Sequence, residues 1–422
     1  MYNLRALIKY EYKKLLQRKA VWIVTLTLMA MAAASVILPP FMTVISSNND
    51  NGDFYYLYDQ YKAQRELTVD LAGRALDDKL LSEMNEAYRK ENESTERITA
   101  APDSEVPYSC KYDDINSIIY SLGLYEADNA YTSTYDNGIP YYTGTAAQLY
   151  DLRKDYLQAR WAQGSLSDEE KAFLTAQEED ITTPFIYRYC GSYKSILATF
   201  TILSVMVSFL TAVCIPPVSA EEHSRKTDQI ILCTRFGRRP AFLAKLFTAV
   251  IFSVAAALLL FISFAVPSFV IYGTEGFSAQ IQFHILDCTW KLTAGQSVLI
   301  LLGISIAAAI MLGCASLYLT EHFRSSIPAM GVLIVFLLIS SFLNIPGQLR
   351  VLSQIWSYCP AKLISVTGGL IDHRLVPFFG TYLASYQVGP FIYLILALLF
   401  AFGGYFIWRR WQAGGRDRKS VV

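Results

Sequence analysis

The stretch SILATFTILSVMVSFLTAVCIPPVSA, residues 195–220, runs directly into EEHSRKTDQIILCTRFGRRPAFLAK, residues 221–245. The first part contains no Asp, Glu, Lys or Arg, and it exceeds the roughly 20 residues that a helix needs to cross a ~30 Å hydrocarbon core. The second part is charged at both ends and has an apolar triplet at its centre. Together they predict a membrane span that leads into a patterned connection outside the bilayer.

The same charge-free pattern recurs along the whole chain, in windows 20–49, 195–220, 246–274, 292–320, 325–349 and 375–408. One charge at mid-span costs about 2.5–3.5 kcal/mol on insertion scales, so its absence favours spanning helices. The composition agrees, because 53% hydrophobic and 17% charged residues make the chain more apolar than an ordinary soluble domain. We therefore predict a mainly α, polytopic membrane protein with six transmembrane helices, at residues 20–45, 195–218, 246–272, 298–320, 327–343 and 390–408.

The orientation follows from Lys and Arg in the short connections, which are enriched on the cytoplasmic side. One side has 18 of these residues, and the other has only Lys291, Arg350, Lys362 and Arg374. We therefore expect both termini in the cytoplasm of a cell whose plasma membrane the chain spans. Residues 46–194, which we call the inserted domain, are expected outside.

The inserted domain differs in charge from the rest of the chain. It holds 27 acidic and 14 basic residues, a net charge of −13, so the remaining residues carry +13. A negative surface suits solubility, and capture of cationic peptides is the more specific alternative. Apolar residues three and four apart predict that the domain is mostly helical, with helices at 54–70, 75–96 and 145–162. A loop is expected at 137–144, and Ser167 followed by Glu170 has the spacing of a capping box.

The remaining segments are assigned from the same map. Residues 1–19 are either an amphipathic interfacial helix or an ordinary basic flank, and a cleaved signal peptide is disfavoured because the apolar segment that follows is too long. The connections are expected to be a cytoplasmic coupling loop at 219–245, an outer loop at 273–297, a cytoplasmic turn at 321–326, an outer re-entrant segment at 344–389 and a cytoplasmic tail at 409–422.

Within the loop at 219–245, the sequence predicts a separate short helix. Pro216-Pro217 is expected to end the second span, because proline cannot continue a regular helix. Glu221-Glu222 suits the start of a new helix by its dipole, and Gly237 is expected to end it. The apolar triplet is Ile230-Ile231-Leu232.

Four cysteines are expected on the outer, oxidising side: Cys110, Cys190, Cys288 and Cys359. An even number there predicts one or two disulfides, with the pairing left open.

The chain lacks the residues that several classes of chemistry require. No G-x-x-x-x-G-K-[ST] motif exists, and no glycine is followed by lysine, so the chain has no P-loop. The six windows have none of the intramembrane charges typical of ion-coupled carriers, and no metal-ligating motif such as H-E-x-x-H occurs. We therefore expect no enzyme activity, no cofactor and no nucleic-acid partner. Work for transport would have to come from another protein.

The loop resembles that of ABC-2 type permeases, the membrane subunits of bacterial ATP-binding-cassette exporters. The matching positions are Glu222, Thr227, the triplet Ile230-Ile231-Leu232, the turn Thr234-Arg235-Phe236-Gly237-Arg238, and Lys245. The family often has glycine before the threonine, where this chain has Lys226. The inserted domain lies outside the resemblance.

The resemblance implies a coupling helix seated on a separate ABC ATPase subunit. It also implies a second permease subunit, as a homo- or heterodimer, and a path lined mainly by the second and fifth spans. The implied coupling residues are Glu221, Glu222, Arg225, Thr227, Asp228, Ile230, Ile231, Leu232, Arg235 and Arg238. The charged members would meet charges on the ATPase, and the triplet would pack into its groove.

Two functions therefore stay open from the sequence. The first is export of an unidentified substrate, with amphipathic, peptide and lipid-like molecules all allowed. The alternative is a non-transporting membrane receptor or scaffold in which residues 46–194 sense a signal.

Overall fold

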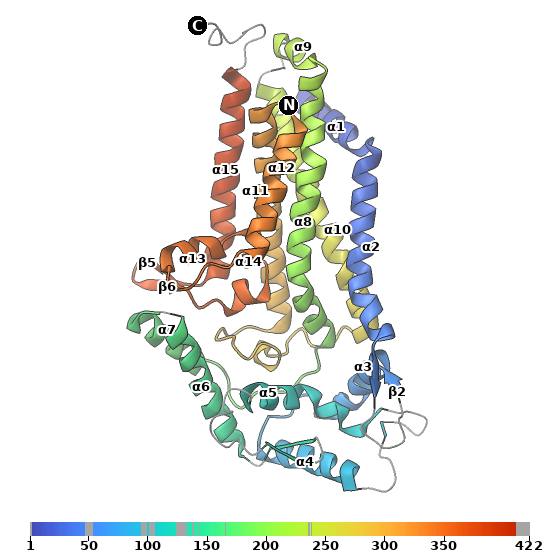
Figure 1. Cartoon of the computed structure of the whole chain (residues 1–422), viewed down its shortest axis with the longest axis vertical. Coiled ribbons are helices and arrows are strands. Elements are labelled where there is room, and N and C mark those ends of the chain that lie inside the picture. The colour runs from blue at the N-terminus through green and yellow to red at the C-terminus, as the bar shows by residue number, and fades with distance from the viewer. Residues whose placement is uncertain are drawn as a thin grey trace.

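The structure is a computed structural model, and it describes residues 2–46, 54–93, 99–100, 106–123, 133–136, 139–142, 144–164, 166–234, 237 and 239–410. Its main feature is a bundle of long helices with a smaller helical domain at one end (Figure 1). The first and the last residues that the structure describes, in its first and last helices, lie at the opposite end of the bundle.

Five helices of the described chain are long and apolar enough to cross a membrane. They are α2 (Lys19–Met42), α8 (Gly191–Ser224), α10 (Arg239–Tyr272), α11 (Ala294–Phe323) and α15 (Ser385–Arg410). A sixth apolar helix, α12 (Ser326–Phe342), has 17 residues and is therefore only about 26 Å long. The chain is thus a polytopic helical membrane protein, with α12 where the fifth of six spans is expected.

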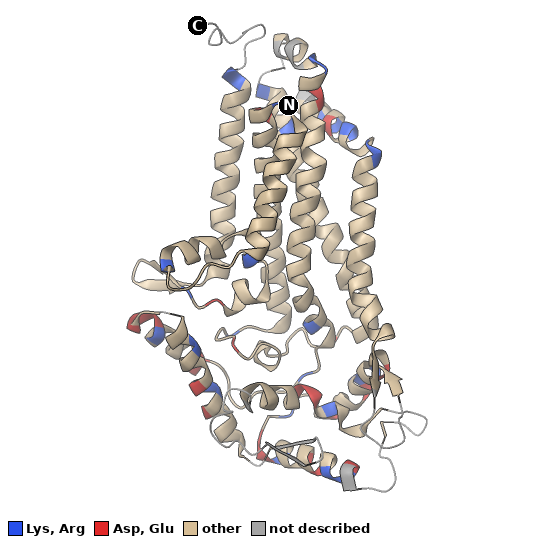
Figure 2. Ribbon diagram, viewed as in Figure 1, with Lys and Arg blue, Asp and Glu red and all other residues tan. Residues whose placement is uncertain are grey.

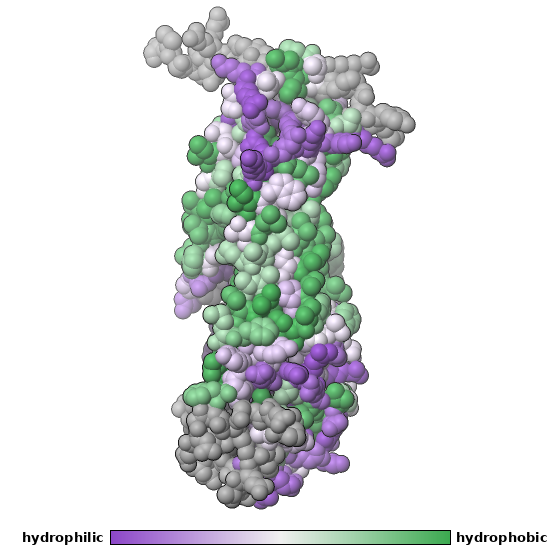
Figure 3. Space-filling model, turned by 90° about the vertical axis from the view of Figure 1, so that its right-hand side faces the viewer, coloured by the Kyte–Doolittle hydropathy of each residue, from purple (hydrophilic) through white to green (hydrophobic). Residues whose placement is uncertain are grey.

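The bundle is organised around α8 and α11. Two thirds of the apolar window of each is buried, against about a quarter for α2 and α15. Small residues allow close packing: a Cβ on Gly313 of α11 would meet the Ser253 hydroxyl of α10 at 2.3 Å. The peripheral helices instead expose large apolar side chains, which form the green band between two polar ends in Figure 3.

Charged residues lie mainly at one end of the bundle and in the inserted domain at the other end (Figure 2). Most of the length of the spans carries no charged residue. The end of the bundle away from the inserted domain holds α1 (Tyr2–Leu16), which packs against α10, and the short helix α9 (Thr227–Cys233). Residues 1–19 thus contain a helix, as both sequence interpretations of this segment allow.

The inserted domain is mostly helical, as its periodicity predicts. Its helices are α3 (Leu57–Leu67), α4 (Asp78–Glu93), α5 (Asp113–Gly123), α6 (Ala146–Gln163) and α7 (Asp168–Glu179), with 3₁₀ turns at Thr68–Leu71 and Tyr108–Tyr112. Two antiparallel strand pairs accompany them: β1 (Val44–Ser46) with β2 (Phe54–Tyr56), and β3 (Ser133–Asp136) with β4 (Ile139–Tyr142). Strand β4 lies where a loop is expected, because a four-residue strand is too short to show periodicity.

The core of the inserted domain includes the loop that follows α10. Phe283, from the 3₁₀ turn Ile281–Phe283, packs among buried side chains of α4, α5 and α6. Arg153 of α6 is 3% exposed and donates hydrogen bonds to the carbonyl oxygens of Leu286 and Cys288. The domain is therefore tied to the bundle through more than its own two chain connections.

The segment between α12 and α15 folds into short pieces beside the bundle. They are α13 (Arg350–Ser357), α14 (Pro360–Leu363), a π-helical turn at Thr367–Ile371, and the hairpin of β5 (Val376–Phe378) and β6 (Thr381–Leu383). In Figure 1 they lie on the side of the bundle next to the inserted domain.

Candidate functional site

The connection between α8 and α10 differs from its sequence prediction in where its helices begin and end. Helix α8 does not stop at Pro216-Pro217 but continues to Ser224. The whole helix has 34 residues. Prolines are tolerated in spanning helices because neighbouring helices and side chains satisfy the freed backbone groups. Glu221-Glu222 therefore lies in the last turn of α8 and does not open a new helix. The short helix α9 ends at Cys233, before Gly237.

A left-handed residue produces the turn between α8 and α9. Lys226 has φ 55°, a conformation that costs an L-residue roughly 1–2 kcal/mol and that glycine adopts freely. This is the position at which the ABC-2 family often has glycine. The hydroxyl of Thr227 then donates to the carbonyl oxygen of Glu222 across the turn.

A buried group of charges lies directly beneath this turn. The ionic cluster consists of Glu11 and Lys14 from α1, Glu222 from α8, Lys245 from α10 and Glu321 from α11. The Glu222 carboxylate lies 2.6 Å from Lys14 Nζ and 2.7 Å from Lys245 Nζ. Lys245 Nζ is also 3.5 Å from one oxygen of Glu321, whose other oxygen lies 2.9 Å from His223 Nε2. Four helices that are far apart in sequence are therefore joined at one point.

The ionic cluster is desolvated. Glu222 is 5% exposed and Lys245 is 4% exposed. Burial raises the pKa of Glu11, the Lys14 ammonium group opposes this, and the nearby Glu222 carboxylate adds to it. Burial alone would lower the pKa of Lys14, but the carboxylates of Glu11 and Glu222 outweigh it and raise that pKa.

The charged residues predicted to meet a partner protein are thus not equivalent. Glu222 is buried in the ionic cluster, so its carboxylate is not presented outward as expected. Glu221 is partly exposed and pairs with Arg18 and Arg225. The side chain of Arg225 is 71% exposed and remains accessible.

The apolar triplet of α9 also divides between two environments. Ile230 is 69% exposed. Ile231 instead packs against a cluster of Phe242, Leu317 and Trp408, which come from α10, α11 and α15. The Trp408 indole N–H donates to the backbone carbonyl of residue 237, and Lys245 Nζ lies 4.3 Å from the Trp408 ring centroid. Helix α9 therefore contacts three spanning helices through Ile231, while Ile230 is exposed.

Four predicted coupling residues cannot be placed in this site. Arg235 and Arg238 lie outside the described residues, and the side chains of Asp228 and Leu232 do as well. In contrast, Glu11, Lys14, Glu321 and Trp408 belong to the site without having been predicted. Of these four, only Glu321 has a signal in the sequence, because it directly follows the charge-free window 292–320, and that position does not reveal its partner.

The four cysteines predicted to form disulfides are all free in the structure. Cys190 Sγ contacts His284 Nε2 instead. Burial raises the pKa of the Cys288 thiol to about 12, so the thiol is unreactive at neutral pH. No group of three or more potential metal ligands occurs in the described part of the chain.

Comparison with family models, curated proteins and solved structures finds no match to this chain. The site geometry therefore has to carry any functional conclusion.

Proposed function

We propose that the chain is the permease subunit of an ABC-2 type exporter, driven by ATP hydrolysis on a separate ATPase subunit. The observation that carries the proposal is the contrast between two residues of α9. Ile230 is exposed, as is Arg225 just before the helix, while Ile231 packs against α10, α11 and α15. A partner that pushes on α9 would move the spans directly.

The ionic cluster would transmit the same movement to α1 and α8. Buried ion pairs hold their partners at fixed distances, because breaking one leaves an uncompensated charge at a cost of about 3–5 kcal/mol. A force on the turn at Lys226 therefore reaches Glu222 and, through it, Lys14 and Lys245. The missing P-loop agrees with a borrowed source of energy.

The proposed path runs between the second and fifth spans, α8 and α12. A cavity of about 10 Å³, lined by Ser208, Thr211 and Ser340 among others, lies between these helices and α14. Such a volume holds about one water molecule, so a path here would be closed in this conformation. A second permease subunit would complete the transporter.

The test is ATPase stimulation by the purified chain. An ABC ATPase from the same source would be co-expressed, and its turnover measured with and without the chain in proteoliposomes. We expect co-purification and faster turnover with the native chain, and loss of both with Ile230→Asp. Ile230 is exposed, so this substitution leaves the folded bundle intact.

Ile327→Asp is the matched control, because Ile327 is 79% exposed and begins α12 at the same end of the bundle. It should leave stimulation unchanged. Equal turnover with native chain and Ile230→Asp, or an ATPase that never co-purifies, would contradict the proposal and leave a receptor or scaffold as the better reading.

A further inference from the structure

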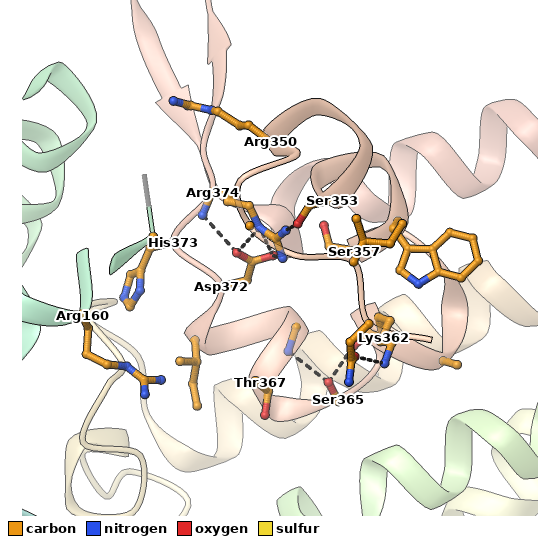
Figure 4. Close-up of a pocket in the computed structure, with 18 of the residues that line it drawn as sticks. Arg160, Arg350, Ser353, Ser357, Lys362, Ser365, Thr367, Asp372, His373 and Arg374 are labelled. Carbon is orange, nitrogen blue, oxygen red and sulfur yellow. Dashed lines mark hydrogen bonds and ion pairs between the residues drawn. The ribbon is translucent and has the colours of Figure 1, made fainter. Parts of the chain in front are cut away.

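A cavity of about 670 Å³ lies where the inserted domain meets the segment between α12 and α15 (Figure 4). Its walls come from the end of α6, the middle of α8, the end of α12, and residues 344–374. Thr201 of α8 lines it, ten residues and thus about 15 Å along that helix. The cavity therefore extends along α8 to residues of the predicted span 195–218, and its size is in the range of ligand pockets.

The charges around the cavity do not cancel. Four cationic side chains line it, Arg160, Arg350, Lys362 and Arg374. The three arginines form ion pairs: Arg160 with Asp287, Arg350 with Glu170, and Arg374 with Asp372.

Lys362 is different, because its ammonium group donates only to neutral oxygens. Its acceptors are the carbonyl oxygen of Ser341 at 3.1 Å and the Asn344 side-chain oxygen at 2.8 Å. None of the ion pairs between described residues includes Lys362. The site thus has one uncompensated positive charge, which suits a ligand with one negative charge.

Two buried polar atoms of the wall also lack partners. They are the indole nitrogen Nε1 of Trp161 and Nε2 of His373. The two rings lie edge to face, 5.9 Å apart between centroids. Burial lowers the pKa of His373 to about 4, so the ring is neutral and one of its nitrogens is an acceptor. A ligand hydroxyl could satisfy an indole donor and an imidazole acceptor at once.

The surroundings of the cavity are apolar on the side away from the bundle. Helix α13 exposes Val351, Leu352 and Ile355, while its Ser353 and Ser357 line the cavity. The adjoining hairpin exposes Phe379 almost completely, at 95%, in a left-handed conformation with φ 44°. Exposed large apolar side chains that lie close together are unfavourable in water and are typical of a surface that contacts a membrane or a partner.

We propose that this cavity binds the head group of one anionic phospholipid from the leaflet nearest the inserted domain, with its phosphodiester at Lys362 and a head-group hydroxyl between Trp161 and His373. The acyl chains leave along α13, whose exposed apolar face continues into the bilayer. A zwitterionic lipid binds less well, because its second charge is positive and finds no free carboxylate among the lining residues.

The test is native mass spectrometry of the full chain in detergent, titrated with dioleoyl phosphatidylglycerol or with dioleoyl phosphatidylcholine. One charge-assisted contact is worth about tenfold in affinity, so we expect phosphatidylglycerol to bind about tenfold more tightly. Lys362→Met should remove this preference, and Lys362→Arg should keep it. Trp161→Phe should weaken binding of phosphatidylglycerol about fivefold while the ring remains in place.

Lys291→Met is the matched control, because Lys291 is an exposed lysine in the 273–297 loop that does not line the cavity. It should leave the preference unchanged. Equal affinities for the two lipids in the native chain, or a preference that survives Lys362→Met, would overturn the proposal. Displacement of the lipid by glycerol phosphate at similar concentrations would also overturn it, since the apolar part would then contribute nothing. The assay contains no ATPase, so its result is independent of the transport proposal.

Discussion

Replacing Lys245 by methionine tests the ionic cluster most directly. Methionine keeps the length and the apolar stem of lysine but removes its charge. In the native chain, Lys245 Nζ lies 2.7 Å from Glu222 and 3.5 Å from Glu321, and both carboxylates are at most 5% exposed. After the substitution, Lys14 is the only cation left in the ionic cluster.

The magnitude follows from this burial. Removing one partner of a buried ion pair costs about 3–5 kcal/mol, because the other charge stays desolvated without compensation. The contact of Lys245 with the Trp408 ring is lost as well, at 4.3 Å from the centroid. We therefore expect Lys245→Met to lower the free energy of unfolding by about 4 kcal/mol. Adding Glu321→Gln should recover about 1–2 kcal/mol, since it removes a buried carboxylate that has lost Lys245 as a partner and keeps His223.

The assay is denaturant unfolding in mixed micelles, followed by far-UV circular dichroism. Arg65→Met is the matched control, because Arg65 forms a 2.7 Å ion pair with Glu275 but both side chains are exposed. A pair of this kind contributes at most about 1 kcal/mol. If Lys245→Met costs no more than Arg65→Met, the ionic cluster is solvated and the reasoning fails.

Three further predictions concern other parts of the chain. Lys226→Gly should stabilise the protein by about 1 kcal/mol, because a φ of 55° costs lysine more than glycine. Arg225→Gly is the control and should destabilise the protein, because Arg225 has a right-handed conformation. Denaturant unfolding measures both changes, and destabilisation by Lys226→Gly would contradict the left-handed turn. Burial lowers the pKa of His284 to about 4, below its ordinary value of 6.5. Between these pH values the imidazole is protonated in the unfolded chain but neutral in the folded one. The free energy of unfolding should therefore fall by up to about 3 kcal/mol as the pH is lowered from 6.5 towards 4. His284→Gln should flatten the unfolding free energy over that range, and an unchanged pH profile would refute this assignment. Arg153→Lys should lower the free energy of unfolding by about 2 kcal/mol in the same assay, because lysine cannot donate to both carbonyl groups of the 273–297 loop. An unchanged free energy would show that this contact is dispensable.

Much of the architecture can be predicted from the sequence alone. Charge-free windows predict spanning helices because hydrocarbon excludes charge and forces backbone groups to pair within one segment. Signals between residues that are close in the chain are also reliable. The predicted capping box at Ser167 and Glu170, for example, is present at the start of α7. Periodicity likewise locates α4 and α6 in the inserted domain.

Other local signals mislead because the environment outweighs them. Pro216-Pro217 would end a helix in water, yet α8 continues through both residues within the packed bundle. The pair Glu221-Glu222 looks like the exposed first turn of a helix, but one carboxylate is buried by lysines from α1 and α10. Four-residue strands such as β4 leave too short a pattern to detect.

By itself, then, the sequence determined the apolar helices, the side of the bundle where positive charge collects, and the absence of a P-loop, since each depends on residues that are neighbours in the chain. Only the tertiary structure decided that Glu222 meets Lys14 from 208 residues away, and that Lys362 and Trp161 line one cavity. The physical reason is that a buried charge or an unpaired polar atom is defined by what surrounds it, and those surroundings come from distant segments that packing brings together.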